Sequence, residues 1–144
     1  MMRWSATGKY GLFLVMLMAW LPVSQAQETD QKFEITSTLE KLYGTEQAEK
    51  FRDIQKPGAS ITWQVYRPYH AGDEPPGLLV YVSPTRSGTM DGRWAKVLDE
   101  YNLAYIAADR SGNRVPVTRR MVLATSAIYA AKQHFEIDER RIYV

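Results

Sequence analysis

The spacing of apolar residues predicts four β-strands in the second half of the chain. Residues 60–67 alternate between apolar and polar side chains and end at Pro68, which is typical of a half-exposed strand near a sheet edge. Residues 78–82 and 103–108 are continuously apolar, as expected for strands that are covered on both faces. Residues 140–144 predict the beginning of one further strand.

Two helices are predicted between these strands. In residues 92–101 apolar side chains recur at intervals of three and four, and Asp91 can cap the first turn. The residues expected on the buried face of this helix are Trp94, Val97, Leu98 and Tyr101. A longer helix is predicted from Pro116, because a proline in the first turn loses no helical hydrogen bond. Its apolar stripe consists of Val117, Met121, Ala124, Ile128, Ala131 and Phe135.

The order strand, helix, strand, helix, strand makes two βαβ units, each expected to cross over right-handedly. The predicted fold class is therefore α/β, with a mainly parallel sheet and helices on its faces. Residues 59–144 are assigned to this domain. In such sheets ligands bind beyond the carboxyl ends of the strands.

Residues 27–58 differ from the rest because they are polar and charged. Ser37 and Glu40 have the spacing of a capping box, and Gly44 can end the short helix that they begin. A second short helix is predicted over residues 45–52. The whole stretch is interpreted as an N-terminal extension and as a surface appendage.

The first 26 residues have the three-part layout of a secretory signal peptide. Arg3 and Lys9 precede an apolar run of about a dozen residues, and Ser24-Gln25-Ala26 provides a small-residue cleavage site. This run is shorter than the roughly 20 residues that span a bilayer, which favours cleavage after Ala26 over an uncleaved anchor. We expect a periplasmic or secreted protein without a stable membrane anchor.

Charge and cysteine content narrow the possible partners. The formal net charge of +2 falls to zero when Arg3 and Lys9 are removed with the signal peptide, so no nucleic-acid partner is expected. The sequence has no cysteine, so an exported fold must be stabilised by its buried core rather than by disulfides. No dinucleotide-binding or P-loop motif occurs, and no cofactor is expected.

Candidate chemistry lies in the loops that follow the two buried strands. Residues 83–88 and 109–113 can point backbone N–H groups into a shared crevice. The residues assigned to this crevice are Ser87, Gly88, Asp109, Ser111, Gly112 and Asn113. Asp109 is either a catalytic acid or, more simply, a cap of its own loop.

Other reactive residues are interpreted as structural. His70 and His134 lack carboxylates at ligand spacing, so no metal site is predicted. None of the four serines that were considered lies in a G-x-S-x-G motif; these are Ser83, Ser87, Ser111 and Ser126. A group of aromatic residues is interpreted as core, with a carbohydrate-stacking surface as the alternative; these are Trp63, Tyr66, Tyr69, Tyr81 and Tyr105.

Three stretches, "GLLVYVSPTRSG", "WAKVLDEYNLAYIAADRSGNRVPVTRRMVLATSAI" and "FEIDERRIYV", resemble exported α/β-hydrolases of the esterase and polyhydroxyalkanoate-depolymerase type. In that group a strand like Arg141-Ile-Tyr-Val144 leads into the nucleophile elbow G-x-S-x-G. The resemblance implies a partial α/β-hydrolase fold that stops at the nucleophile strand. The serine, the acid and the histidine follow that strand in such enzymes, so no catalytic residue is expected up to Val144.

The same resemblance implies that one half of the oxyanion hole is present. In α/β-hydrolases one backbone N–H of this hole comes from the loop that corresponds to residues 83–88. Pro84 has no N–H, so Thr85 is the first candidate donor and Arg86 the second.

Three functions follow as expectations. The first is an exported serine hydrolase of small or polymeric carboxylic esters, of which this chain is an N-terminal portion that is inactive alone. The second is a non-catalytic exported protein that binds a small ligand or a glycan on the same scaffold. The third is an exported serine peptidase, which differs from the first in its leaving group.

Overall fold

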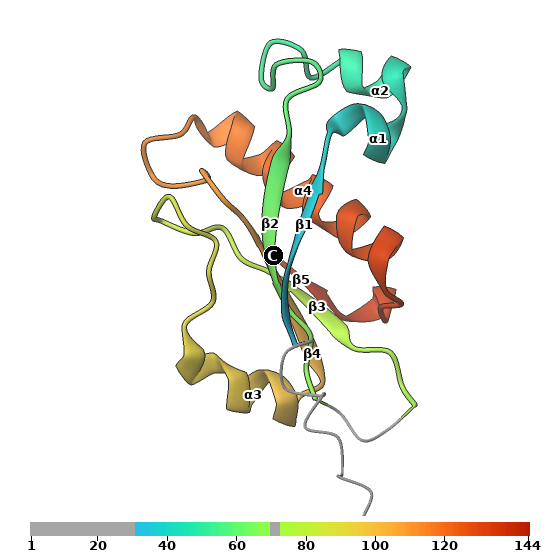
Figure 1. Ribbon diagram of the computed structural model, residues 1–144, viewed down its shortest axis with the longest axis vertical. Coiled ribbons are helices and arrows are strands. Elements are labelled where there is room, and N and C mark those ends of the chain that lie inside the picture. Colours follow the sequence, from blue (N-terminus) through green and yellow to red (C-terminus); the bar gives the residue numbers. More distant parts are fainter. Residues whose placement is uncertain (1–30, 70–72) are drawn as a thin grey trace, which may run out of the picture.

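The computed structural model describes residues 31–69 and 73–144, which form a five-stranded mixed sheet with helices on its faces (Figure 1). The predicted signal peptide and His70 lie outside the described residues. The strands are β1 (Lys32–Ser37), β2 (Ile61–Tyr66), β3 (Gly77–Val80), β4 (Leu103–Ala108) and β5 (Ile142–Tyr143). The helices are α1 (Leu39–Tyr43), α2 (Thr45–Glu49), α3 (Ala95–Glu100) and α4 (Val117–His134), with short 3-10 helices η1 (Gly92–Trp94) and η2 (Glu139–Arg141).

The strands lie in the order β1-β2-β4-β3-β5. Strand β2 is antiparallel to both β1 and β4, whereas β3 is parallel to β4 and to β5. The predicted α/β class and the parallel pairing of the three βαβ strands are confirmed. Strand β2 lies near the edge of the sheet as predicted, with only β1 outside it, but it is more buried than the predicted half-exposed strand.

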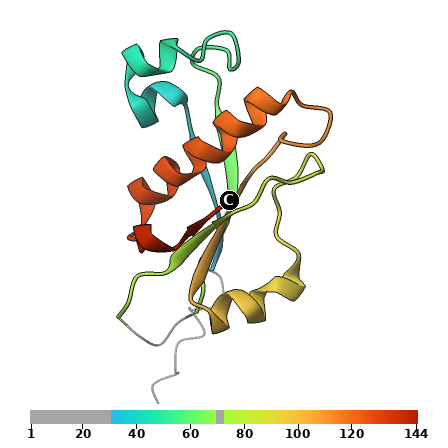
Figure 2. The same cartoon turned by 180° about the vertical axis from the view of Figure 1, so that it is seen from behind.

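Strand β4 separates two apolar cores. Ala104, Ile106 and Ala108 face the larger core, where α1 and α4 pack, while Tyr105 and Ala107 face the smaller one, where α3 packs. Side chains alternate in direction along a strand, so a run that is apolar throughout can fill both cores. Figure 2 shows α4 crossing in front of the strands on the larger-core face.

Trp63 joins the sheet to α4. Its side chain is fully buried, and its indole Nε1 donates a hydrogen bond to the carbonyl oxygen of Leu123 at 3.2 Å. A buried indole N–H requires such an acceptor. The contact fixes the position of α4 along β2.

The N-terminal stretch is not a surface appendage. Strand β1 pairs with β2, and Ile35, Leu39 and Leu42 are buried in the larger core. Residues 32–36 alternate between polar, exposed positions and apolar positions, but the run is short and its last buried position is Ser37, which is polar. These residues therefore form part of the folded unit.

The N-terminal helices begin and end close to the predicted positions. Thr38, and not Ser37, caps α1, and its side-chain oxygen accepts from the Lys41 N–H at 3.4 Å. The helix ends at Gly44, whose φ of 82° lies in the left-handed region that glycine adopts readily. Helix α2 then ends at Glu49, three residues before the predicted end.

The predicted helix over residues 92–101 buries less than expected. Only Leu98 is buried, while Trp94, Val97 and Tyr101 are 38%, 51% and 59% exposed. The first turn is a 3-10 helix, which changes the angular spacing of the side chains, and α3 has only six residues. Trp94 packs at its edge against Tyr81, with ring centroids 5.4 Å apart.

Helix α4 is present as predicted, but its buried face is rotated. Ala124, Ala131 and Phe135 are buried, whereas Val117 and Met121 are 68% and 63% exposed. Leu123, Ala127 and Ala130 complete the buried face, where alanine lets the helix approach the sheet closely. Within the described residues no helix is long and apolar enough to cross a membrane.

Candidate functional site

The loops that follow β3 and β4 lie side by side at the carboxyl ends of these parallel strands (Figure 2). The Arg110 N–H donates to the Arg86 carbonyl oxygen at 2.6 Å, and the Asn113 N–H donates to the Pro84 carbonyl oxygen at 3.0 Å. The structure thus brings together the two loops that the sequence assigned to one crevice.

Asp109 holds the two loops in register from the end of β4. Its Oδ1 accepts from the Gly88 N–H at 2.7 Å, and its Oδ2 accepts from the Gln64 side-chain amide at 2.9 Å. The same Gln64 nitrogen also donates to Glu34, at 2.8 Å. With both oxygens occupied, Asp109 acts as a structural anchor, which agrees with the simpler of its two interpretations.

Two crevice glycines are required because backbone passes close to them. A Cβ on Gly88 would lie 2.3 Å from the Ala107 carbonyl oxygen, and one on Gly112 would lie 2.7 Å from that of Thr85. A Cβ atom does not come this close to a carbonyl oxygen in real structures. Each glycine therefore lets one loop pack directly on the neighbouring strand or loop.

Tyr105 supports the first loop from inside the smaller core. Its hydroxyl donates to the Gly88 carbonyl oxygen at 2.9 Å, while its side chain is 1% exposed. Burial raises the pKa of this phenol, and the nearby Tyr81 and Asp109 act in the same direction. The hydroxyl therefore stays protonated and continues to donate at high pH.

The two candidate oxyanion donors differ in their surroundings. The Thr85 N–H donates to Ser83 Oγ at 3.2 Å, within a turn that Ser83 forms with its own loop. Among the described residues, no acceptor binds the Arg86 N–H. Arg86 therefore presents the less engaged donor of the two, in an exposed part of the loop.

The hydroxyl groups of the remaining serines form hydrogen bonds with nearby residues of their own segments. Ser111 and Ser126 are buried, and their hydroxyls donate to the carbonyl oxygens of Ala108 and Val122, at 2.8 Å and 2.7 Å. Ser87 Oγ is paired with Thr89 Oγ1 at 2.7 Å. His134 lies in the last turn of α4, with Nδ1 2.8 Å from the Ala130 carbonyl oxygen.

Most of the singled-out aromatic side chains belong to the core. Trp63, Tyr66 and Tyr105 are buried, Tyr81 is half-buried, and only Tyr69 is largely exposed. The core interpretation therefore holds for the buried three. Among residues 31–69 and 73–144, no three His, Asp or Glu side chains gather as metal ligands would.

A cavity of about 500 Å³ opens between the two loops and the start of α4. Thr85, Arg86, Gly112 and Asn113, all assigned to the site from sequence, line it. Pro84 and Arg110 also line it and lie in the two predicted loops, whereas sequence reasoning missed Arg114, Val115 and Arg119. The arginines after position 109 were a visible signal, but their spacing does not reveal that they share one cavity.

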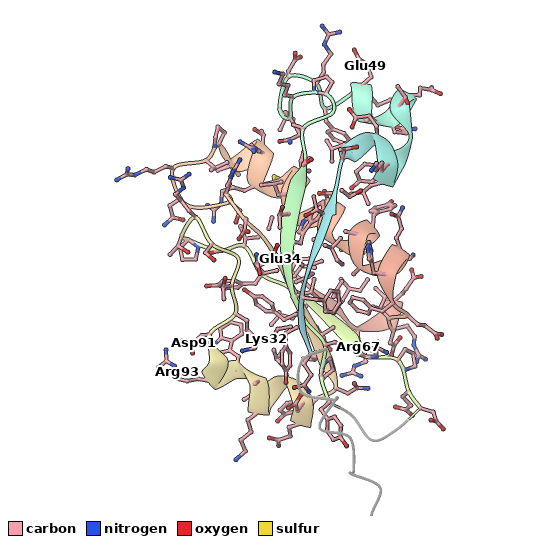
Figure 3. All side chains as sticks on the ribbon, in the orientation of Figure 1. Lys32, Glu34, Glu49, Arg67, Asp91 and Arg93 are labelled. Carbon is pink, nitrogen blue, oxygen red and sulfur yellow. The ribbon has the colours of Figure 1, made fainter. Side chains whose placement is uncertain are left out.

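A second cavity, of about 360 Å³, lies on the other side of the first loop. Hydroxyl groups line it, from Ser83, Thr85, Ser87 and Thr89, together with Tyr81 and Trp94. Asp91 and Arg93, which are labelled in Figure 3 at the start of η1, also line it. Their contact, 2.6 Å between Arg93 Nη2 and Asp91 Oδ2, lowers the pKa of Asp91 to about 2.

No protein-family model, curated protein or solved structure matches this chain. Function is therefore inferred from the residues and the geometry of the two loops.

Gly88→Ala is expected to lower the free energy of unfolding by about 1–3 kcal/mol, because the new methyl group would overlap the Ala107 carbonyl. Gly92→Ala is the matched control, since no atom lies within 4 Å of its added Cβ, and should change stability by less than about 0.5 kcal/mol. Urea denaturation followed by circular dichroism measures both. Equal effects of the two variants would show that Gly88 is not tightly packed.

The raised pKa of Tyr105 predicts a high-pH effect on stability. The Tyr105 phenol holds its proton more tightly in the folded protein than in the unfolded chain. Its contribution to the free energy of unfolding is therefore fully present below about pH 10. It is lost as pH rises through the higher folded-state pKa. In a spectrophotometric titration of the nine tyrosines, Tyr105→Phe should leave the absorbance change near pH 10 undiminished. A decrease by one tyrosine equivalent at that pH would contradict this prediction.

Proposed function

We propose that this chain is the N-terminal part of an exported serine hydrolase of the α/β-hydrolase type that acts on carboxylic esters. In this proposal the serine, the acid and the histidine follow Val144. The serine would attack the ester carbonyl while the histidine takes its proton, and backbone N–H groups would stabilise the oxyanion. The alcohol would leave with that proton, and water would then hydrolyse the acyl-serine to release the acid.

The arrangement of the sheet carries the proposal. Its order β1-β2-β4-β3-β5, in which β2 alone runs against the other strands, is the one expected for the N-terminal half of an α/β-hydrolase sheet. A fold alone does not establish an activity, so the position of the loops matters as well.

The register of β5 adds a second line of support. Leu78 pairs with Ile142 and Leu79 with Tyr143, so that continued pairing would bring the residues after Val144 beside Tyr81 and Val82. A nucleophile elbow at that position would stand next to the loop of residues 83–88. This is the loop from which such enzymes take one oxyanion donor.

Within that loop, the proposal assigns the donor to the Arg86 N–H. The Thr85 N–H is already engaged by Ser83 Oγ, whereas the Arg86 N–H has no acceptor among the described residues. A donor that is held in place but not yet bonded can meet a developing oxyanion without reorganisation.

A non-catalytic protein that binds a glycan or another small ligand is the second candidate. The hydroxyl-lined cavity beside Trp94 and Tyr81 favours it, because aromatic faces and hydroxyl groups suit a polyhydroxylated ligand. A stop codon directly after Val144, together with saturable glycan binding that Trp94→Ala abolishes, would support this candidate.

The coding sequence beyond Val144 and serine labelling test the hydrolase. A G-x-S-x-G motif within a few codons is expected, followed by an acidic residue and a histidine. A fluorophosphonate probe should label the folded full-length protein, and replacement of the motif serine by alanine should abolish labelling. An intact, folded protein that the probe leaves unlabelled would overturn the proposal.

Proline substitution tests which N–H serves the oxyanion. In the full-length protein, Arg86→Pro removes the proposed donor and should lower kcat about 10²- to 10³-fold. Thr85→Pro removes the N–H that Ser83 already occupies and should have a much smaller effect. Circular dichroism of both variants checks that each is folded. A larger loss for Thr85→Pro would move the assignment to Thr85.

A further inference from the structure

Four arginine side chains converge on the larger cavity between the loops. Arg86 comes from the loop after β3, Arg110 and Arg114 from the loop after β4, and Arg119 from the first turn of α4. Among the described residues that line this cavity there is no aspartate, glutamate or histidine. Its wall is therefore positively charged.

These four guanidinium groups have no carboxylate partner within residues 31–69 and 73–144. The ion pairs in that part of the chain use other cations, namely Arg52, Arg93, Lys132 and Arg140. The Nε of Arg119 is also shielded from solvent without a hydrogen-bond partner. A shielded donor and several unpaired like charges are unfavourable until an anion binds them.

Asp109 forms no ion pair with the arginines of this wall. It lines a smaller neighbouring cavity of about 210 Å³, and its two oxygens already accept from Gly88 and Gln64. Arg110 and Arg119 line both cavities. A single neighbouring carboxylate leaves the group of four arginines with a net positive charge.

Apolar surface accompanies the charge. Pro84 and Val115 line the same cavity, and the methylene stems of the arginines add to that surface. A bare ion would leave these groups without contacts. An organic molecule with an acidic group would satisfy both parts of the wall.

We propose that this cavity binds the carboxylate or phosphate group of a small organic molecule. Guanidinium groups match both anions because their planar N–H pairs donate two parallel hydrogen bonds. The inference about substrate rests on the proposed function: since Arg86 supplies both the oxyanion donor and part of the cationic wall, the preferred ester carries an acidic group near its acyl carbonyl.

Binding is tested without catalysis, by isothermal titration of the full chain with succinate and, separately, with inorganic phosphate. Arg114→Gln and Arg119→Gln are each expected to weaken binding of the preferred anion about tenfold or more. Arg52→Gln is the matched control, because Arg52 pairs with Glu49 and does not line the cavity. Arg114 is exposed, so its variant is expected to keep the fold, which circular dichroism verifies.

The result that supports the site is saturable binding that both cavity variants weaken and Arg52→Gln does not. Absence of saturable binding of either anion, or equal weakening by all three variants, would overturn it. Tighter binding of succinate identifies a carboxylate as the recognised group, and tighter binding of phosphate identifies a phosphate.

A kinetic comparison in the full-length protein tests the substrate class. The p-nitrophenyl monoester of succinic acid should have a lower KM than neutral p-nitrophenyl butyrate, and Arg114→Gln should remove that difference. Hydrolysis of both esters with equal KM would contradict the inferred substrate class but not the proposed hydrolase activity. Anion binding without any hydrolysis or serine labelling would contradict the proposed hydrolase activity but not the proposed anion site.

Discussion

Strand β4 lies in the middle of the sheet, hydrogen-bonded to β2 on one side and to β3 on the other, with side chains buried on both faces. Ala104, Ile106 and Ala108 fill one core, and Tyr105 and Ala107 fill the other. Because such a strand cannot shift by one residue without reversing every side chain, its register sets that of its neighbours. It also determines where the chain leaves the sheet at Asp109.

The positions of the loops that follow β3 and β4 are fixed by contacts with β4. Asp109 continues directly from β4 and accepts from the Gly88 N–H, while Tyr105 donates to the carbonyl oxygen of the same glycine. Gly88 is thus held on both sides by β4, with the Ala107 carbonyl directly against its Cα. A loop of small polar residues, which would otherwise be mobile, is tied to the most buried strand. The Arg86 N–H, the proposed oxyanion donor, lies two residues before this anchored glycine.

The two faces of the first loop offer different chemistry. One faces the cavity lined by Arg86, Arg110, Arg114 and Arg119, and the other faces a cavity lined by hydroxyl groups and Trp94. A site between them could hold a neutral, hydroxylated part of a ligand on one side and an acidic part on the other. The proposed hydrolase and the proposed anion site are consistent with this division because Thr85, which directly precedes the proposed donor Arg86, lines both cavities.

The apolar pattern by itself determined the α/β class, the positions of β2, β3, β4 and α4, and the two loops of the site, because continuous or periodic burial leaves a local trace. Only the tertiary structure decided that residues 32–37 form a strand, since the alternation is short and its last buried position, Ser37, is polar. It also decided which face of α4 is buried, because Trp63 and the alanines Ala127 and Ala130 select it. The choice between Thr85 and Arg86, and the meeting of four arginines, depend on contacts between loops that are distant in sequence, which no local pattern encodes.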